Sequence, residues 1–200
     1  MTTDRIDLVA ASIPPNSLYL TLNFSGGQSA LSLIPESPSI VLKHGTLKHT
    51  VSIAKLEDRE CVADFLEINP LTAKKLGLTP NRRYEINYSA ANRTLTLTSS
   101  PVSLANGVIL SSPKLGMGTV SIGYELLARL GIPERRGFPL RLQLGSQKFN
   151  LRLFVPTNLD ENRLTLSSYW AKKLQLVSGH SYSLRYDQRT STIAIVARSG

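Results

Sequence analysis

Apolar residues follow the same spacing three times along this chain. Two apolar residues lie two positions apart, a second such pair begins eight residues later, and a third begins six residues after that. The three sets are Leu66, Ile68, Leu76, Leu78, Tyr84 and Ile86; Val120, Ile122, Leu130, Ile132, Phe138 and Leu140; and Leu164, Leu166, Leu174, Leu176, Tyr182 and Leu184. A spacing kept over three copies indicates a duplicated supersecondary unit.

Each copy reads as a strand, a short helix and then further strands. Residues two apart share one face of a strand, so each apolar pair outside the helix predicts a short strand. The eight-residue step holds a capping residue followed by helix formers, as in residues 69–75 and 167–173, which predicts a two-turn helix. We expect the helix to end at Gly77 and Gly131, where glycine takes the left-handed conformation without steric cost, while the third copy has Gln175 there.

A hairpin is expected to close each unit. The interval from Tyr88 to Leu95 equals that from Tyr186 to Ile193, and both intervals contain turn-favouring residues. In the middle copy, Gly145 suits the first central position of a two-residue turn. The register predicted from this turn pairs Leu144 with Gln147, Leu142 with Phe149, Leu140 with Leu151 and Phe138 with Leu153.

A fourth, degenerate unit precedes the three regular copies. It is built from Leu18, Leu20 and Leu22, a loop with Gly26-Gly27, and strands around residues 40–44 and 51–53. Because the largest interval between unit starts lies in the middle of the chain, we expect a domain boundary there. The predicted organisation is an N-terminal segment at 1–17, a first barrel at 18–100, a linker or connecting strand at 101–117, and a second barrel at 118–200.

Strand, helix and hairpin, taken twice, resemble the pattern of small pseudo-twofold β-barrels. The predicted fold class is therefore mainly β with short helices, as tandem barrels of the double-psi or swapped-hairpin type. Such barrels are made from the four strand-helix-hairpin units, but a fold does not determine a function.

Charge divides the chain unequally. Residues 1–100 hold 10 Lys and Arg against 9 Asp and Glu, whereas residues 101–200 hold 13 against 5, so nearly all of the net charge of +9 lies in the second half. A basic half favours an anionic partner. The predicted hairpin places Arg141 and Arg152 diagonally adjacent on the face opposite the core, with Lys148 nearby and Arg135 and Arg136 before the strand, as a candidate binding surface. Solubility and protection of a strand face are the other reading of the same charges.

Residues that would carry chemistry are sparse, so we expect no catalytic site, no metal and no cofactor. His44 and His49 could meet across a hairpin, but two imidazoles without a Cys or acidic cluster make a poor metal site. The lone Cys61 excludes an internal disulfide and fits a reducing compartment. Tyr84, Tyr88, Tyr182 and Tyr186 are expected in the core with hydroxyls at a barrel rim, with a base-stacking platform as the alternative.

The repeated string from Ile68 to Leu76-Gly77-Leu78, and from Ile122 to Leu130-Gly131-Ile132 with residues 138–145, resembles the N-terminal region of the endospore coat-associated YheC/YheD family. The resemblance covers about residues 18–197 and implies a coat-associated or substrate-presenting module. Longer members continue into an ATP-grasp ligase domain that uses ATP and Mg²⁺, and no catalytic residue of that domain falls within this chain.

The sequence therefore predicts a non-catalytic binding or assembly module whose basic half contacts an anionic protein or polymer. The resemblance implies the spore coat as its partner, or a role as the recognition part of an ATP-grasp ligase, including the recognition half of a split or truncated enzyme. The alternative is a DNA-binding regulator that uses the basic face of a swapped-hairpin barrel. No stretch is long and apolar enough for a membrane span, and no secretory signal is recognised, so a cytoplasmic or coat location is expected. The oligomeric state stays open.

Overall fold

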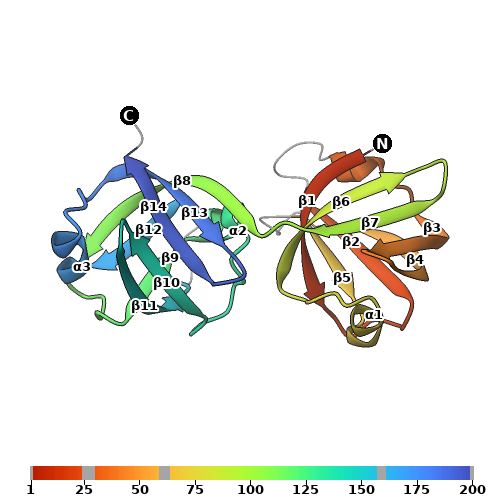
Figure 1. The fold of residues 1–200 in the computed structure, drawn as a ribbon, viewed down its shortest axis with the longest axis horizontal. Helices are drawn as coiled ribbons and strands as arrows, with labels where there is room; N and C mark the ends of the chain where they lie inside the picture. Colours follow the sequence, from red (N-terminus) through yellow and green to blue (C-terminus); the bar gives the residue numbers. More distant parts are fainter. Residues whose placement is uncertain (1, 24–29, 59–63, 157–160, 199–200) are drawn as a thin grey trace. The chain divides into compact units, whose positions relative to one another are not determined.

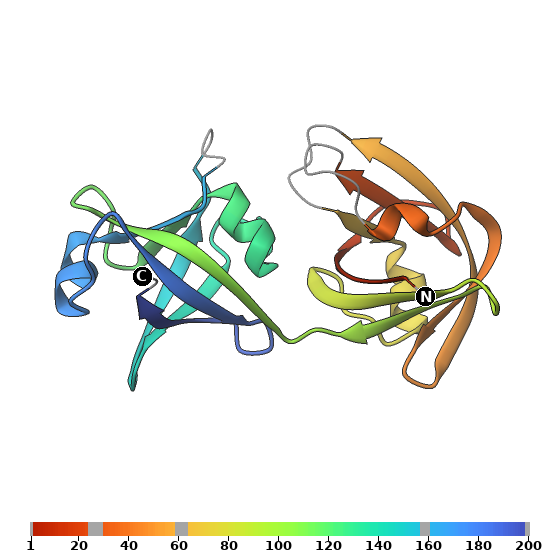
Figure 2. The same cartoon turned by 90° about the horizontal axis from the view of Figure 1, so that it is seen from above.

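The computed structural model describes residues 2–23, 30–58, 64–156 and 161–198 of the chain (Figures 1 and 2). It separates into two compact units, Met1–Ser100 and Pro101–Gly200. Cys61 and the pair Gly26-Gly27 lie outside the described residues.

The first unit is a closed barrel of seven strands. Its strands are joined along the chain by one 3-10 helix and one α-helix. The elements are β1 (Thr2–Ala10), β2 (Ser17–Asn23), η1 (Ala30–Leu33), β3 (Ser37–His44), β4 (Leu47–Asp58), β5 (Phe65–Ile68), α1 (Pro70–Lys75), β6 (Arg82–Ser89) and β7 (Thr94–Ser99). The order around the barrel is β1-β5-β2-β4-β3-β7-β6, and β6 pairs with β1 to close it.

The second unit is also a closed barrel of seven strands. Its elements are β8 (Val102–Ser112), β9 (Thr119–Ile122), α2 (Tyr124–Leu130), β10 (Pro139–Leu144), β11 (Gln147–Phe154), β12 (Arg163–Ser167), α3 (Ser168–Lys173), β13 (His180–Asp187) and β14 (Thr192–Arg198). The order around this barrel is β10-β11-β9-β12-β8-β13-β14.

The two barrels have one topology. When β1 is matched with β8, β2 with β9, and so on to β7 with β14, every strand pair of the first barrel has a counterpart of the same direction in the second. For example, β2 runs parallel to β4 as β9 does to β11, and β3 runs antiparallel to β4 as β10 does to β11. Mainly β tandem barrels are thus confirmed, and the whole barrel is duplicated as well as the smaller unit.

Two of the predicted boundaries are wrong. The prediction leaves residues 1–17 outside the first barrel, but β1 is a member of it, parallel to β5 and antiparallel to β6. The segment 101–117, predicted as a linker or connecting strand, does contain a strand, β8, but this strand is the matching member of the second barrel, between β12 and β13. Each barrel therefore has one strand more than two strand-helix-hairpin units provide. This strand was missed because the repeated spacing does not include it.

The strand-helix-hairpin units themselves form as predicted. Asn69 caps α1 by accepting a hydrogen bond from the Leu71 N–H at 2.9 Å, and Ser167 caps α3 by accepting one from the Trp170 N–H at 3.4 Å. Gly77 and Gly131 end their helices with φ values of 63° and 68°. The degenerate unit is likewise a strand, a short helix and a hairpin, formed by β2, η1, β3 and β4.

The predicted hairpin register is also correct. Tyr88 lies opposite Leu95 and Tyr186 opposite Ile193. Between β10 and β11 the turn has Gly145 at φ 56°, and the paired residues are Leu144 with Gln147, Leu142 with Phe149 and Leu140 with Leu151. Beyond the strand end, the Leu153 N–H donates to the Phe138 carbonyl at 2.9 Å, so the pairing continues to the fourth predicted pair.

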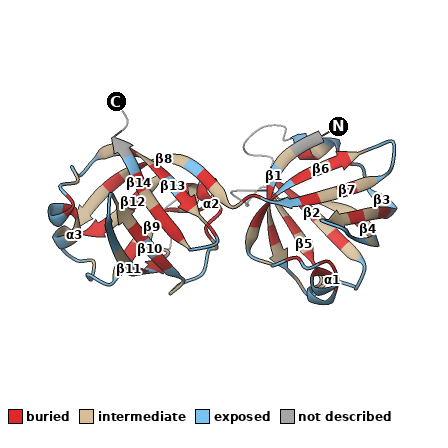
Figure 3. Cartoon of the chain, in the orientation of Figure 1, coloured by how far each residue is buried: buried red, intermediate tan, exposed pale blue. Residues whose placement is uncertain are grey.

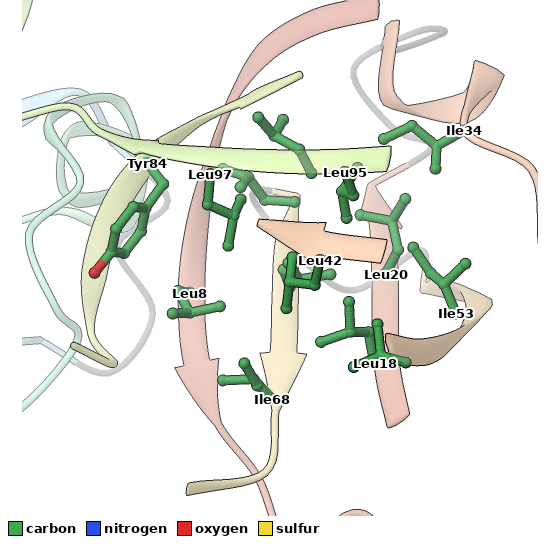
Figure 4. Packing of buried hydrophobic residues seen from close by; sticks show 14 of the residues in the cluster. Leu8, Leu18, Leu20, Ile34, Leu42, Ile53, Ile68, Tyr84, Leu95 and Leu97 are labelled. Carbon is green, nitrogen blue, oxygen red and sulfur yellow. The ribbon is translucent and has the colours of Figure 1, made fainter. Parts of the chain in front are cut away.

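Each barrel encloses its own hydrophobic core (Figure 3). In the first unit, leucine and isoleucine side chains from opposite strands meet inside the barrel, among them Leu8, Leu42 and Ile68 (Figure 4). Of the residues in the threefold repeat all are buried except Phe138 and Leu176, which are partly buried and pack against the second core.

Candidate anion-binding surface

The five basic residues singled out in the sequence all lie exposed on the second unit. Arg141 on β10 stands between the buried Leu140 and Leu142, and Arg152 on β11 stands between buried leucines in the same way. Because side chains alternate across a strand, burial of the leucines turns both arginines to the outer face of the barrel. These two strands are adjacent in the sheet (Figure 1).

Arg141 and Arg152 are diagonal neighbours on the paired strands. Arg141 lies opposite Asn150, and Arg152 follows two residues later on the same face. The Arg141 Nε donates to the Asn150 Oδ1 at 3.4 Å, and the Arg152 Nη1 donates to the Gly137 carbonyl at 3.4 Å. Both bonds are long and lie at the surface, so they leave other donors of each guanidinium able to contact a partner.

The other three cations extend this surface in both directions along the hairpin. Lys148 lies opposite Gln143, next to the turn. Arg135 and Arg136 precede β10 at the other end of the hairpin, where the Arg136 guanidinium carbon lies 5.5 Å from the centroid of the Phe154 ring. We call Arg135, Arg136, Arg141, Lys148 and Arg152 the basic surface.

Acidic side chains pair with three other cations of this unit. Ion pairs join Arg129 to Glu125, Arg163 to Glu161 and Arg189 to Asp187. In the last pair, the side-chain hydrogen bond lowers the pKa of Asp187 and raises the pKa of Arg189, so both stay charged at neutral pH. Within the described part of the chain, no residue of the basic surface forms an ion pair, so its charge is available to an anion.

The first barrel supplies an internal comparison for this surface. The turns at Gly45 and Gly145, with φ values of 58° and 56°, are equivalent, and so are the hairpins on either side of them. The positions of Arg141 and Arg152 are occupied there by Val41 and Ser52, whereas Lys148 corresponds to Lys48. Since the same barrel forms with Val and Ser at these positions, the fold does not require the two arginines.

An aromatic cluster next to the hairpin was not found by the sequence analysis. Phe149 and Trp170 have ring centroids 4.1 Å apart, and Tyr169 meets Trp170 edge-on at 4.9 Å. The Lys173 Nζ lies 5.1 Å from the Trp170 centroid, 5.6 Å from that of Tyr169 and 5.8 Å from that of Phe149. The Trp170 indole N–H donates to the Met117 carbonyl at 2.6 Å and so fixes the ring.

The sequence signal for this cluster lies in α3, the short helix that corresponds to α1 of the first barrel. Tyr169 and Trp170 occupy in α3 the positions of Leu71 and Thr72 in α1. Phe149 corresponds to His49, whose Nε2 lies 2.6 Å from the Asn16 Oδ1, while the Asn16 N–H donates to the Thr72 hydroxyl. The hydrogen-bonded His49 and Thr72 of the first barrel are thus replaced by the aromatic Phe149 and Trp170 in the second. Helix propensity alone does not distinguish these two sets of residues.

Each of the two hairpin histidines has a hydrogen-bond partner other than the second histidine. His44 lies opposite Leu47 and its Nδ1 is 2.9 Å from the Leu76 carbonyl oxygen, whereas His49 lies opposite Leu42. The two histidines are diagonal neighbours on one face of the hairpin, but the His49 Nε2 faces the Asn16 Oδ1 and the His44 ring packs edge-on against Tyr84. Among the described residues there is no group of three or more His, Cys, Asp or Glu able to hold a metal ion.

The four strand tyrosines are core residues. Tyr84, Tyr88, Tyr182 and Tyr186 are all at least nine-tenths buried, so their rings cannot serve as a base-stacking platform. The Tyr84 and Tyr182 hydroxyls accept hydrogen bonds from the N–H groups of Thr79 and Val177, as expected for hydroxyls at a rim.

Comparison of the chain with protein-family models, with curated proteins and with solved structures gives no match. None of the helices in the described ranges is long and apolar enough to cross a membrane.

Proposed function

We propose that this protein is a non-catalytic binding module and that its second barrel binds an anionic polymer or an acidic protein through the basic surface. The observation that carries the proposal is the contrast between the two barrels. Two exposed arginines lie on one hairpin of the second barrel, at positions where the first barrel has Val41 and Ser52.

The chemistry of the basic surface fits a polyanion. Arginine offers a planar fork of donors that matches carboxylate and phosphate groups. Several cations on one face also release counterions from a densely charged polymer, which makes the affinity depend steeply on salt. An isolated small anion would gain little from five exposed cations, because each is screened by solvent.

The proposal is tested by replacing the two arginines with the residues that the first barrel has at the equivalent positions. The substitutions Arg141→Val and Arg152→Ser introduce the residues of the first barrel at the equivalent positions. The full chain and this double variant are titrated at low salt against labelled polyglutamate, inorganic polyphosphate and duplex DNA. We expect at least one probe to bind, with an affinity that falls as salt rises, and the double variant to bind it about tenfold or more weakly.

The matched control removes the same charge from the near-neutral unit. Lys74→Gln with Lys75→Gln takes two exposed cations from the end of α1 and is expected to leave binding nearly unchanged. Equal losses in the two double variants would mean that net charge alone attracts the probe. Failure of all three probes to bind in dilute buffer would overturn the proposal.

Association with the spore coat, and a place beside an ATP-grasp ligase, rest on the sequence resemblance alone and stay predictions. The alternative of a DNA-binding regulator is addressed by the duplex probe. That alternative requires duplex DNA to be preferred over polyglutamate and polyphosphate at equal salt.

A further inference from the structure

We propose that the partner of the basic surface is a single-stranded nucleic acid, whose bases stack on exposed aromatic rings at the two ends of the β10–β11 hairpin. This inference rests on the proposed function, because the same cations would hold the phosphates. It adds a second kind of contact that a simple polyanion could not make.

The exposed aromatic side chains of the described chain lie on the basic unit. Among its exposed large apolar residues, only Phe154, at 36% exposure, and Tyr169, at 50%, are aromatic. The equivalent positions of the first barrel hold Ala54 and Leu71. Aromatic rings and the two additional arginines are therefore found together on one barrel and are replaced together on the other.

Each of the two exposed rings already has a cation over it. Arg136 lies over Phe154, and Lys173 lies over Tyr169 and its neighbours Trp170 and Phe149. A ring beside a cation can contact a base and its phosphate together, which is the combination that single-strand-binding proteins use. A base that stacks on Tyr169 would take the place of the Lys173 ammonium, which can then reach the neighbouring phosphate.

The cations lie between the two aromatic ends. Along β11 the outer face carries Lys148, Asn150, Arg152 and then Phe154, while Phe149 belongs to the aromatic cluster at the turn end. The five residue steps from Phe149 to Phe154 span about 17 Å of strand. This length accommodates about five nucleotides at the stacked spacing of about 3.4 Å.

The rings distinguish a single strand from other polyanions. In duplex DNA the faces of the bases are covered by stacking on both sides, so exposed rings gain nothing there without unstacking the duplex. Polyphosphate and acidic peptides offer charge but no row of planar rings. Single-stranded nucleic acid presents both phosphates and free base faces, whatever its sequence.

Trp170 provides a direct measurement, because it is the only tryptophan in the chain and it lies in the aromatic cluster. The full chain is titrated with an oligothymidylate of about 15 nucleotides and with an abasic phosphodiester of the same length, and Trp170 fluorescence is followed together with the anisotropy of the labelled oligomer. We expect oligothymidylate to bind about tenfold or more tightly than the abasic strand, and only the former to change Trp170 fluorescence strongly.

The variants Tyr169→Ala and Phe154→Ala separate stacking from charge. Each is expected to weaken oligothymidylate binding about fivefold or more, in line with the stacking of one base, and to leave abasic binding unchanged. Leu71→Ala, which removes an exposed apolar side chain at the position equivalent to Tyr169, is the matched control and should change neither. Circular dichroism confirms that the variants are folded.

The outcomes for this inference and for the proposed function can be told apart. Equal binding of the oligothymidylate and abasic strands, or unchanged oligothymidylate binding by Tyr169→Ala and Phe154→Ala, overturns stacking but leaves a polyanion-binding surface. Preference for duplex DNA or polyglutamate over oligothymidylate also overturns it. Absence of binding to every anionic probe overturns both.

Discussion

Single residues show how closely the two barrels repeat each other. The Tyr84 hydroxyl accepts from the N–H of a residue five positions earlier, at 2.9 Å, and the Tyr182 hydroxyl does the same at 2.8 Å. The carbonyls of Arg93 and Ser191, both at positive φ, accept from the N–H groups of Val41 and Arg141 on the neighbouring parallel strand. The duplication therefore extends to hydrogen bonds that fix the turns, which explains why aromatic and turn residues recur at one spacing.

Gly123 carries a prediction at this scale. It caps α2 at an ordinary φ of −71°, but a Cβ there would overlap the backbone carbonyl of Glu161, so that part of the backbone would have to shift. Gly123→Ala is expected to lower the free energy of unfolding by about 1–3 kcal/mol through this overlap. Urea unfolding followed by circular dichroism measures the change.

Gly118→Ala is the control for this effect, since no atom lies within 4 Å of the position of its Cβ and its φ is not in the left-handed region. A change of less than about 0.5 kcal/mol is expected there. Similar losses for the two variants would contradict the argument, because Gly118→Ala meets no neighbour and restricts mainly the unfolded chain, which does not lower stability.

At the scale of elements, the three α-helices are each followed by a residue in the left-handed conformation, although the residue type differs. Gly77, Gly131 and Gln175 occupy the same place after α1, α2 and α3, and their φ values are 63°, 68° and 54°. The third copy departs from the others in residue type alone. A residue with a side chain in this region is strained by contact of its Cβ with the backbone.

Gln175→Gly is therefore expected to stabilise the second unit. Relief of the left-handed strain should exceed the added freedom of the unfolded chain, for a net gain of about 0.5–1 kcal/mol in the free energy of unfolding. Thermal or urea unfolding of the second unit measures it. Gly77→Ala, the opposite change at the equivalent position, should destabilise the first unit by a comparable amount, and a loss of stability in Gln175→Gly would contradict the argument.

The candidate surface was largely predictable from its hairpin. Gly145 determines the turn, the turn determines the register, and the register places Arg141 and Arg152 diagonally on the outer face. The aromatic cluster was not predictable in this way. Its members come from β11 and α3, which are distant in sequence, and only the packing of that helix against the barrel end brings Trp170 to Phe149.

At the scale of the whole molecule, each half has a complete barrel and a core of its own. A unit of about 100 residues is large enough to bury a core, and closure gives every described strand a paired neighbour on both sides. Separate chains of residues 1–100 and 101–200 are therefore each expected to unfold cooperatively in urea. The second chain should also bind polyanions with the affinity of the whole protein, while the first should not bind at the same salt concentration.

That experiment has two ways to fail. A half that does not fold by itself would show that its stability depends on the other half. A second half that folds but loses polyanion binding would show that residues of the first contribute to the surface.

What the sequence by itself determined was local. Alternation decided which residues face a core, capping residues and glycines decided where helices begin and end, and turn residues decided the hairpin registers, because each depends on neighbours within a few positions. Only the tertiary structure decided that β1 and β8 complete the barrels, since their partners β5, β6, β12 and β13 lie far along the chain and pairing of strands leaves no periodic mark. The same holds for the aromatic rings beside the basic surface, which become neighbours only when the barrel has closed.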